Sequence, residues 1–164
     1  MFLPGPEDTF RLGLQLGGKL RPGDTLALYG NLGAGKTLLT QGLARGLGVD
    51  EETAVVSPTF LLACEYEGRL PLFHLDVYRL DGDDFVESGL DEYFTRHAVT
   101  VVEWADRIET DLPYPRLALR LEIIPGDGRR AFLTAEGPGF EDVIGEIASI
   151  MEKEEELKIK EKQG

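Results

Sequence analysis

Three glycines within six residues, followed directly by Lys-Thr, constrain this sequence more than any other feature. The stretch is GNLGAGKT, from Gly30 to Thr37, and it fits the pattern G-x-x-x-x-G-K-[ST]. Glycine tolerates left-handed backbone conformations and lets backbone N–H groups come close to a phosphate. An apolar run over residues 24–30 precedes the stretch, and apolar residues at helical spacing follow it over 36–47. The pattern predicts a strand, a phosphate-binding loop and a helix, which together are typical of an α/β fold.

The rest of the sequence alternates between strand-like and helix-like periods, as a mixed α/β domain does. Period-two alternation of apolar and polar residues predicts strands, and acid-capped polar segments predict short helices. The expected helices are at residues 7–17, 36–47 and from about 138 to 151, with short helices within 81–97. The expected strands are at 24–30, within 60–80 on both sides of a turn around Gly68, at 98–104, and at 116–124 and 129–137 as a hairpin.

Length, charge and cysteine content limit the number of domains, the classes of binding partner and the cellular location that we expect. The 164 residues suit one domain, which we place at residues 1–151, followed by a charged tail at 152–164 that is helical or disordered. The net charge of −13 disfavours direct capture of DNA or RNA, because such binding needs clustered Lys and Arg. The sequence shows no apolar run of membrane-spanning length and no secretory signal, and Cys64 is the single cysteine. We therefore expect a cytoplasmic protein without membrane contact.

Two carboxylates at strand ends are candidates to act together with the phosphate-binding loop. Glu103 ends the strand VTVVE, and Asp76 lies late in the strand LPLFHLD. Ligands of open α/β sheets bind beyond the carboxyl ends of the strands, so we expect both acids near the loop. Thr59, in SPTF, is a candidate to sense a terminal phosphate, and a plain bend at Pro58 is the alternative.

Several of these residues also have a purely structural explanation. Glu103 can be a solvated strand end, and Asp76 can simply pair with Arg79. Trp104, next to Glu103, is a residue type found more often in the core than in the chemistry of a site. His74 fits a packed residue of its strand.

Taken together, the motifs resemble the TsaE family, also called YjeE, of small bacterial P-loop ATPases of tRNA threonylcarbamoyladenosine synthesis. The matching segments are GNLGAGKT, VVSPTF, PLFHLDVYRL, GLDEYF and VVEWADRI, in the family's order, within about residues 7–137. The resemblance implies an α/β, P-loop NTPase-like fold of three layers with a mixed, partly antiparallel β-sheet. It also implies ATP and Mg²⁺ as cofactors and TsaD and TsaB as protein partners. Those partners transfer threonylcarbamoyl to adenosine 37 of tRNAs that read codons beginning with A, so contact with tRNA is indirect.

The resemblance assigns a role to each matching residue. Lys36 and Thr37 match the phosphate and Mg²⁺ ligands of the loop, and Glu103 matches the acid associated with Mg²⁺. Asp76 matches the acid proposed to orient or activate the attacking water, and Thr59 matches a switch-like threonine. The expected catalytic residues are therefore Lys36, Thr59 and Asp76. The expected nucleotide-binding residues are Gly30, Asn31, Leu32, Gly33, Ala34, Gly35, Lys36, Thr37 and Leu38 in the loop, Trp104 near the nucleotide, and Thr9, Phe10 and Arg130 around the adenine.

Two loop positions depart from the family's usual residues, and three other functions remain open. Asn31 replaces an Asp and Leu38 replaces a second Thr, but phosphate binding uses backbone N–H groups and survives both changes. A small-molecule kinase is disfavoured because residues 79–97 hold six acids and two arginines, a poor lid for phosphate. A GTPase would carry an N/T-K-x-D motif, which the sequence lacks. The third alternative is a nucleotide-dependent binding module with negligible turnover.

Overall fold

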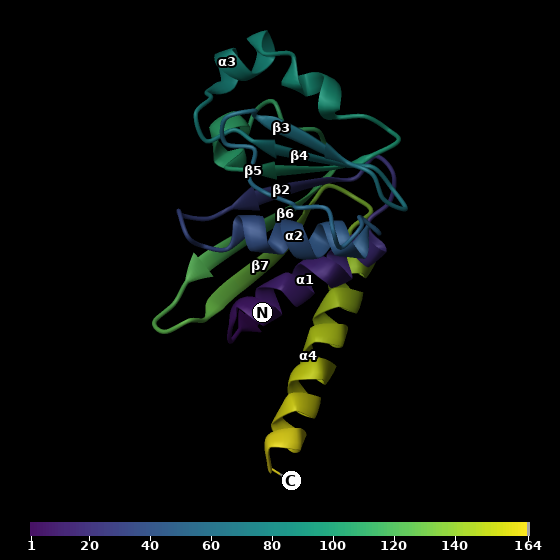
Figure 1. The fold of residues 1–164 in the computed structure, drawn as a ribbon, viewed down its shortest axis with the longest axis vertical. Helices are drawn as coiled ribbons and strands as arrows, with labels where there is room; N and C mark the ends of the chain where they lie inside the picture. Colours follow the sequence, from purple (N-terminus) through teal and green to yellow (C-terminus); the bar gives the residue numbers. More distant parts are fainter. Residues whose placement is uncertain (164) are drawn as a thin grey trace.

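The computed structural model describes residues 1–163, which fold around one seven-stranded mixed β-sheet (Figure 1). The strand order is β1-β7-β6-β2-β5-β4-β3. The four inner strands β6, β2, β5 and β4 run parallel, whereas β3 and the pair β7 and β1 are antiparallel to their neighbours. The expected mixed, partly antiparallel sheet is confirmed. The strands are β1 (Phe2–Leu3), β2 (Thr25–Tyr29), β3 (Ala63–Tyr66), β4 (Leu72–Asp76), β5 (Val99–Glu103), β6 (Arg116–Ile123) and β7 (Arg129–Glu136).

Helices cover both faces of the sheet, so the expected three layers are present. One face carries the long helices, and the other carries three short ones over the β2, β5 and β4 region. The long helices are α1 (Pro6–Lys19), α2 (Lys36–Gly46) and α4 (Glu141–Gln163). The short helices are α3 (Gly82–Glu87) and the 3₁₀ helices η1 (Leu90–Tyr93) and η2 (Ala105–Ile108).

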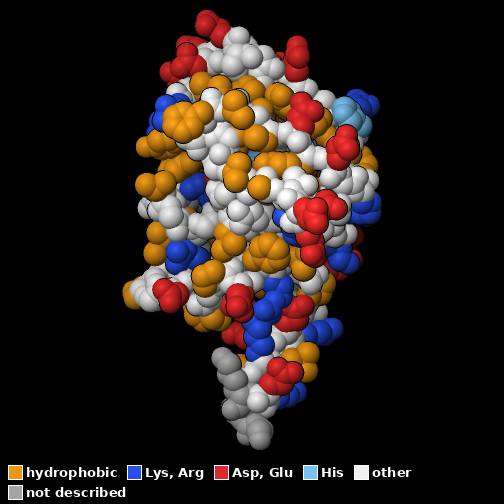
Figure 2. Space-filling model, viewed as in Figure 1, with side chains coloured by type: hydrophobic (Ala, Val, Ile, Leu, Met, Phe, Trp, Pro, Cys, Tyr) orange, Lys and Arg blue, Asp and Glu red, His pale blue; other side chains and the backbone are white. Residues whose placement is uncertain are grey.

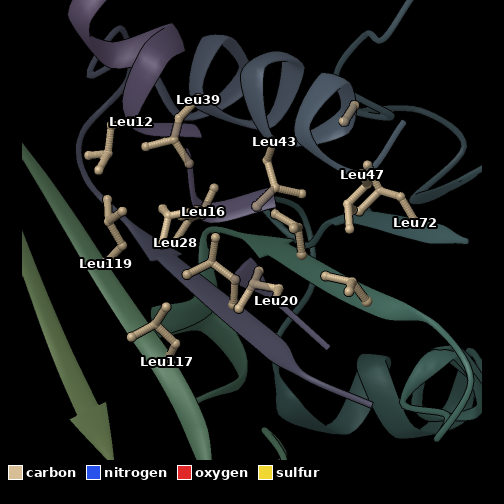
Figure 3. Packing of buried hydrophobic residues seen from close by; sticks show 14 of the residues in the cluster. Leu12, Leu16, Leu20, Leu28, Leu39, Leu43, Leu47, Leu72, Leu117 and Leu119 are labelled. Atoms are coloured by element: carbon tan, nitrogen blue, oxygen red, sulfur yellow. The ribbon is translucent and has the colours of Figure 1, made fainter. Parts of the chain in front are cut away.

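The core lies between the sheet and the long helices and is built mainly from leucine. Residues at i and i+4 in each helix point to the sheet, and alternate residues of each strand point back to them (Figure 3). Each fully buried leucine contributes roughly 1.5–3 kcal/mol relative to an exposed one. The leucines in this layer include Leu12 and Leu16 of α1, Leu39 and Leu43 of α2, Leu28, Leu72, Leu117 and Leu119 of the strands.

Glycines bring α1 and α2 into direct backbone contact. Gly13 and Gly17 of α1 face Gly42 and Gly46 of α2. A Cβ on Gly42 would lie 1.9 Å from the Phe10 carbonyl oxygen, and one on Gly13 would lie 2.0 Å from the Leu39 carbonyl oxygen. Because α2 starts directly after the Gly-rich loop, this close packing also fixes the helix end beside the loop.

The two ends of the chain add features beyond the expected elements. The short strand β1 was not expected, and it pairs with β7. α4 begins at Glu141 and continues to Gln163. The tail, expected to be either helical or disordered, is therefore helical over residues 152–163. Residue 164 lies outside the described residues. Lys158 of α4 pairs with Asp8 of α1 at 2.6 Å. The domain boundary at residue 151 stays a prediction. Over residues 1–163, no helix combines the length and apolar character needed to cross a membrane.

Candidate nucleotide-binding site

The Gly-rich loop joins the end of β2 to the start of α2, at the edge where the parallel strands end. Gly30, Gly33 and Gly35 have φ values of 149°, 77° and 104°, which side-chain-bearing residues rarely adopt. A Cβ on Gly30 would also lie 2.6 Å from the Leu121 carbonyl oxygen. The helix dipole of α2 places partial positive charge at the loop, which favours an anion there.

A cavity of about 390 Å³ opens beside this loop. Most of the residues expected from the sequence line it, so residues far apart in the chain are brought together. They are Leu32, Gly33, Gly35, Lys36, Thr37, Leu38, Thr59, Asp76, Glu103 and Trp104. Gly30 and Asn31 belong to the same loop and reach the site through their carbonyl groups, while Ala34 is fully buried behind it.

Lys36 lies across the loop. Its ammonium group donates to the carbonyl oxygens of Gly30 at 2.6 Å and Asn31 at 3.0 Å, and it lies 3.8 Å from the centre of the Trp104 ring. Burial lowers the pKa of Lys36, and nearby carboxylates, led by Glu103, act in the opposite direction. A bound phosphate would add further negative charge and favour the protonated lysine.

Thr37 and Glu103 form an oxygen pair whose spacing is compatible with one Mg²⁺ ion. The Thr37 hydroxyl donates to the Glu103 carboxylate at 3.1 and 3.3 Å, and Glu103 is only 2% exposed. Neighbouring oxygen ligands of octahedral Mg²⁺ lie about 3 Å apart, so both groups fit one ion. Among residues 1–163 no group of three or more Asp, Glu, His or Cys side chains is placed to hold a metal. Phosphate oxygens and water would complete the shell, as is usual for Mg²⁺.

His74 fixes the carboxylate of Glu103 from the side. It is fully buried, as the sequence suggested, and its Nε2 lies 2.8 Å from Glu103 Oε1. The ring proton belongs on Nε2, because a lone pair there would face the carboxylate; Nδ1 has no hydrogen-bond partner among the described residues. Sequence reasoning missed this contact. The available signal was the spacing of His74 and Asp76, since residues i and i+2 of a strand share a face.

Asp76 lies opposite Glu103 in the register between β4 and β5 and is 4% exposed. Its carboxylate accepts from the hydroxyl of Ser57, from that of Thr59 at 3.4 Å and from the backbone N–H of Tyr78 at 3.1 Å. Ser57 was not among the expected residues, although it lies in the same SPT segment as Thr59. The two hydroxyls donate to the same carboxylate oxygen, Oδ2, and so fix the orientation of the carboxylate at the cavity.

The structural alternatives for Asp76 and Trp104 are less well supported. The guanidinium of Arg79 lies over the ring of Phe60 at 4.7 Å, and no ion pair with Asp76 is present in the part of the chain that the structure describes. Trp104 is half-buried at the cavity and has φ of 61°, an outlier for a bulky residue. Such backbone strain concentrates at functional sites, which favours a role for Trp104 in binding.

The residues expected around the adenine are not gathered in one place. Thr9 is buried next to the loop, where its Cγ2 would lie 3.4 Å from a Cβ on Gly35. Phe10 lines a separate cavity of about 420 Å³ beside α2. Arg130 is exposed on β7, on the face opposite to its buried neighbour Ala131. None of these three residues lines the cavity at the loop, whereas Trp104, expected near the nucleotide, does. The adenine contacts stay a prediction.

The mixed sheet, the Gly-rich loop between a buried parallel strand and a helix, and two acids at neighbouring strand ends define a P-loop NTPase-like protein. A family model described as "Threonylcarbamoyl adenosine biosynthesis protein TsaE" matches residues 3–131. The chain belongs to the TsaE family, whose members take part in tRNA threonylcarbamoyladenosine biosynthesis.

Individual relatives are similar to this chain in sequence or structure over most of its length. The tRNA threonylcarbamoyladenosine biosynthesis protein TsaE of Bacillus subtilis is 43% identical over 144 residues, covering 87% of this chain and 89% of the relative. The TsaE protein of Treponema pallidum is 42% identical over 130 residues, covering 79% and 94%. The crystal structure of Bacillus subtilis YdiB superposes with a TM-score of 0.74 at 36% identity, covering 94% of both chains. The fold and the family expected from the motifs are therefore confirmed.

Proposed function

We propose that this chain is the ATP-binding and ATP-hydrolysing subunit of threonylcarbamoyladenosine synthesis, working in the cytoplasm with TsaD and TsaB. In this proposal the partners transfer threonylcarbamoyl to adenosine 37 of tRNAs that read codons beginning with A, and they make the tRNA contacts. The observation that carries it is the meeting of Lys36, the oxygen pair of Thr37 and Glu103, and the buried Asp76 in one cavity beside the loop.

Each residue has one physical task in this scheme. The loop N–H groups and Lys36 hold the phosphates, while Thr37 and Glu103 hold Mg²⁺, which when bound offsets the phosphate charge. His74 keeps the Glu103 carboxylate turned toward the metal position. Asp76 orients the attacking water and accepts its proton, and the hydroxyls of Ser57 and Thr59 hold the carboxylate in place through its other oxygen, Oδ2.

The acidic surface above the sheet favours this proposal over a small-molecule kinase. Exposed Asp and Glu side chains gather around α3, at the top of the molecule in Figure 2. Such a segment would repel a second phosphorylated substrate, whereas kinase lids supply arginines to the transferred group.

Reconstitution with TsaD, TsaB, tRNA and Mg²⁺-ATP tests the proposed function. The unmodified chain should sustain repeated rounds of tRNA modification and hydrolyse ATP as it does so. Lys36→Ala should abolish both, because the phosphates lose their main side-chain charge, and circular dichroism should show an intact fold. If a non-hydrolysable ATP analogue sustains repeated rounds equally well, the chain is a nucleotide-dependent binding module and the ATPase assignment is wrong.

We expect the isolated chain to prefer ADP over GDP by about tenfold or more, which corresponds to roughly one lost base-specific interaction. The sequence lacks the acidic N/T-K-x-D motif that reads guanine. Trp104 is the single tryptophan and lines the cavity, so its fluorescence reports binding directly. Titrations with and without Mg²⁺ should show that the metal matters less for binding than for hydrolysis. Equal affinity for the two nucleotides would contradict the adenine assignment.

A further inference from the structure

Arg129, the first residue of β7, reaches from the β6–β7 hairpin to the Gly-rich loop. Its Nε donates to the Ala34 carbonyl oxygen at 3.0 Å, and its Nη2 donates to the Gly33 carbonyl oxygen at 3.0 Å. Its Nη1 donates within the hairpin turn, to the carbonyl oxygen of Gly128 at 2.8 Å. One guanidinium therefore ties the turn of the hairpin to two successive peptide groups of a loop that lies far away in the sequence.

The contact with the Ala34 carbonyl affects the direction of the next N–H group in the loop. In a trans peptide the N–H points away from the C=O, so anchoring the Ala34 carbonyl turns the Gly35 N–H to the other side. Gly35 lines the cavity, and its φ of 104° shows that the loop backbone is held in a conformation most residues avoid. A planar guanidinium can hold two carbonyls in fixed relative positions, which an ammonium group does not do as well.

Lys36 and Arg129 hold different halves of the same loop. Lys36 binds the carbonyls of Gly30 and Asn31, whereas Arg129 binds those of Gly33 and Ala34. If Lys36 turns to a bound phosphate, it must release its carbonyls, but Arg129 donates from outside the cavity and can stay. The contacts of Arg129 are therefore the ones that can persist in both the free and the nucleotide-bound protein.

The sheet holds Arg129 firmly in place. It pairs in register with Ile123 of β6 on one side and with Leu3 of β1 on the other. The support of the loop therefore lies at the turn end of β7, at a position that is paired with a strand on each side. The unexpected strand β1 contributes to this support, because it pairs with β7 at the position of Arg129.

We propose that Arg129 is a positioning residue that pre-organises the loop for phosphate, an inference that rests on the proposed nucleotide site. It does not touch the phosphates. By holding the Ala34 carbonyl it aims the Gly35 N–H at the phosphate position, and by holding the Gly33 carbonyl it supports the turn in which the Ala34 N–H donates to the Asn31 carbonyl oxygen at 3.0 Å. Pre-organisation lowers the cost of ordering the loop upon binding. Its loss should weaken every ligand that carries a phosphate chain and spare the fold.

Three variants separate this role from a general loss of structure. Arg129→Met approximates the length of the side chain and removes every donor, and Arg129→Lys restores the positive charge and an ammonium donor without the planar guanidinium. Arg120→Met is the matched control, since Arg120 lies on the neighbouring strand but faces the ring of Tyr29 on the opposite side of the sheet. Affinities for ADP and pyrophosphate come from titrations followed by Trp104 fluorescence, and amide hydrogen exchange of residues 30–37 is measured without ligand.

Arg129→Met should bind ADP and pyrophosphate about ten- to a hundred-fold more weakly, the range expected for losing charge-assisted hydrogen bonds. Its loop amides should exchange about tenfold faster, since local opening becomes easier. Arg129→Lys should fall between Arg129→Met and the unmodified chain, and Arg120→Met should match the unmodified chain. If Arg129→Met does not fold, Arg129→Lys decides by the same two measurements.

Two results have distinct meanings. Unchanged exchange in the ligand-free Arg129 variants overturns this inference, whatever the ligands do. An unmodified chain that binds neither ADP nor pyrophosphate overturns the proposed function instead, and the exchange rates still decide whether Arg129 braces the loop.

Discussion

Replacing Asp76 with asparagine is expected to lower ATP hydrolysis in the proposed complex with TsaD and TsaB by about 10²- to 10⁴-fold, the usual contribution of a positioned proton acceptor. Asparagine keeps the shape of the side chain and can still bond to the hydroxyls of Ser57 and Thr59, but it cannot take up a proton. Affinity for ATP should stay nearly unchanged, because the carboxylate lies with the hydroxyls and not with the loop carbonyls that Lys36 holds. Single-turnover hydrolysis and multiple-turnover tRNA modification measure the loss.

Two further variants of acidic residues serve as a comparison and a control for Asp76→Asn. Glu103→Gln should weaken the Mg²⁺ dependence and the metal-linked binding of ATP, because it removes a charge from the oxygen pair with Thr37. Asp83→Asn, at an exposed position of α3, removes the same charge far from the cavity and should behave as the unmodified chain. A normal hydrolysis rate in the Asp76→Asn complex would leave Asp76 as a structural residue of β4.

Replacing Gly42 with alanine is expected to destabilise the fold by roughly 3 kcal/mol, near the upper end for overpacking. The added Cβ would lie 1.9 Å from the Phe10 carbonyl oxygen, and a backbone atom in a helix cannot move aside cheaply. α1 and α2 would have to separate, which opens the leucine layer beneath them. For a domain of this size such a loss lowers Tm by roughly 6–12 °C.

Gly18 of α1 supplies the matched control for Gly42→Ala. A Cβ on Gly18 would meet nothing within 4 Å, and the residue is exposed. Gly18→Ala should therefore raise stability by up to about 1 kcal/mol, because alanine favours the helix more than glycine does. Thermal unfolding followed by circular dichroism measures both variants. Equal Tm values for the two would show that the helix contact is looser than these distances indicate.

The parts of the fold and site that could be predicted are those that depend on patterns of residues close together in the sequence. The loop from Gly30 to Thr37 follows from its glycine spacing, and Asp76 and Glu103 follow from the rule that ligands meet strand ends. The hairpin strands β6 and β7 follow from alternation on both sides of the turn Pro-Gly-Asp-Gly at residues 125–128. In each case a few neighbouring residues carry the whole signal.

What could not be predicted depends on contacts between distant segments. β1 is two residues long, too short for any periodicity to show. The bonds of His74 to Glu103 and of Arg129 to the loop arise only once the strands are in register. Glycines inside helices lower the expectation of a helix, and only the partner helix shows why they are needed.

The pairing of Asp76 with Glu103 across adjacent parallel strands has a consequence for how such a site can change. Both acids are spaced by the backbone ladder, so their separation has no continuous adjustment. Deleting one residue within β4 would not move Asp76 by a fraction of an ångström; it would turn the side chain to the opposite face, toward α3. The backbone register therefore allows only stepwise changes in the positions of the two acids. Small changes in the distance between the two carboxylates are available only through their side-chain rotamers.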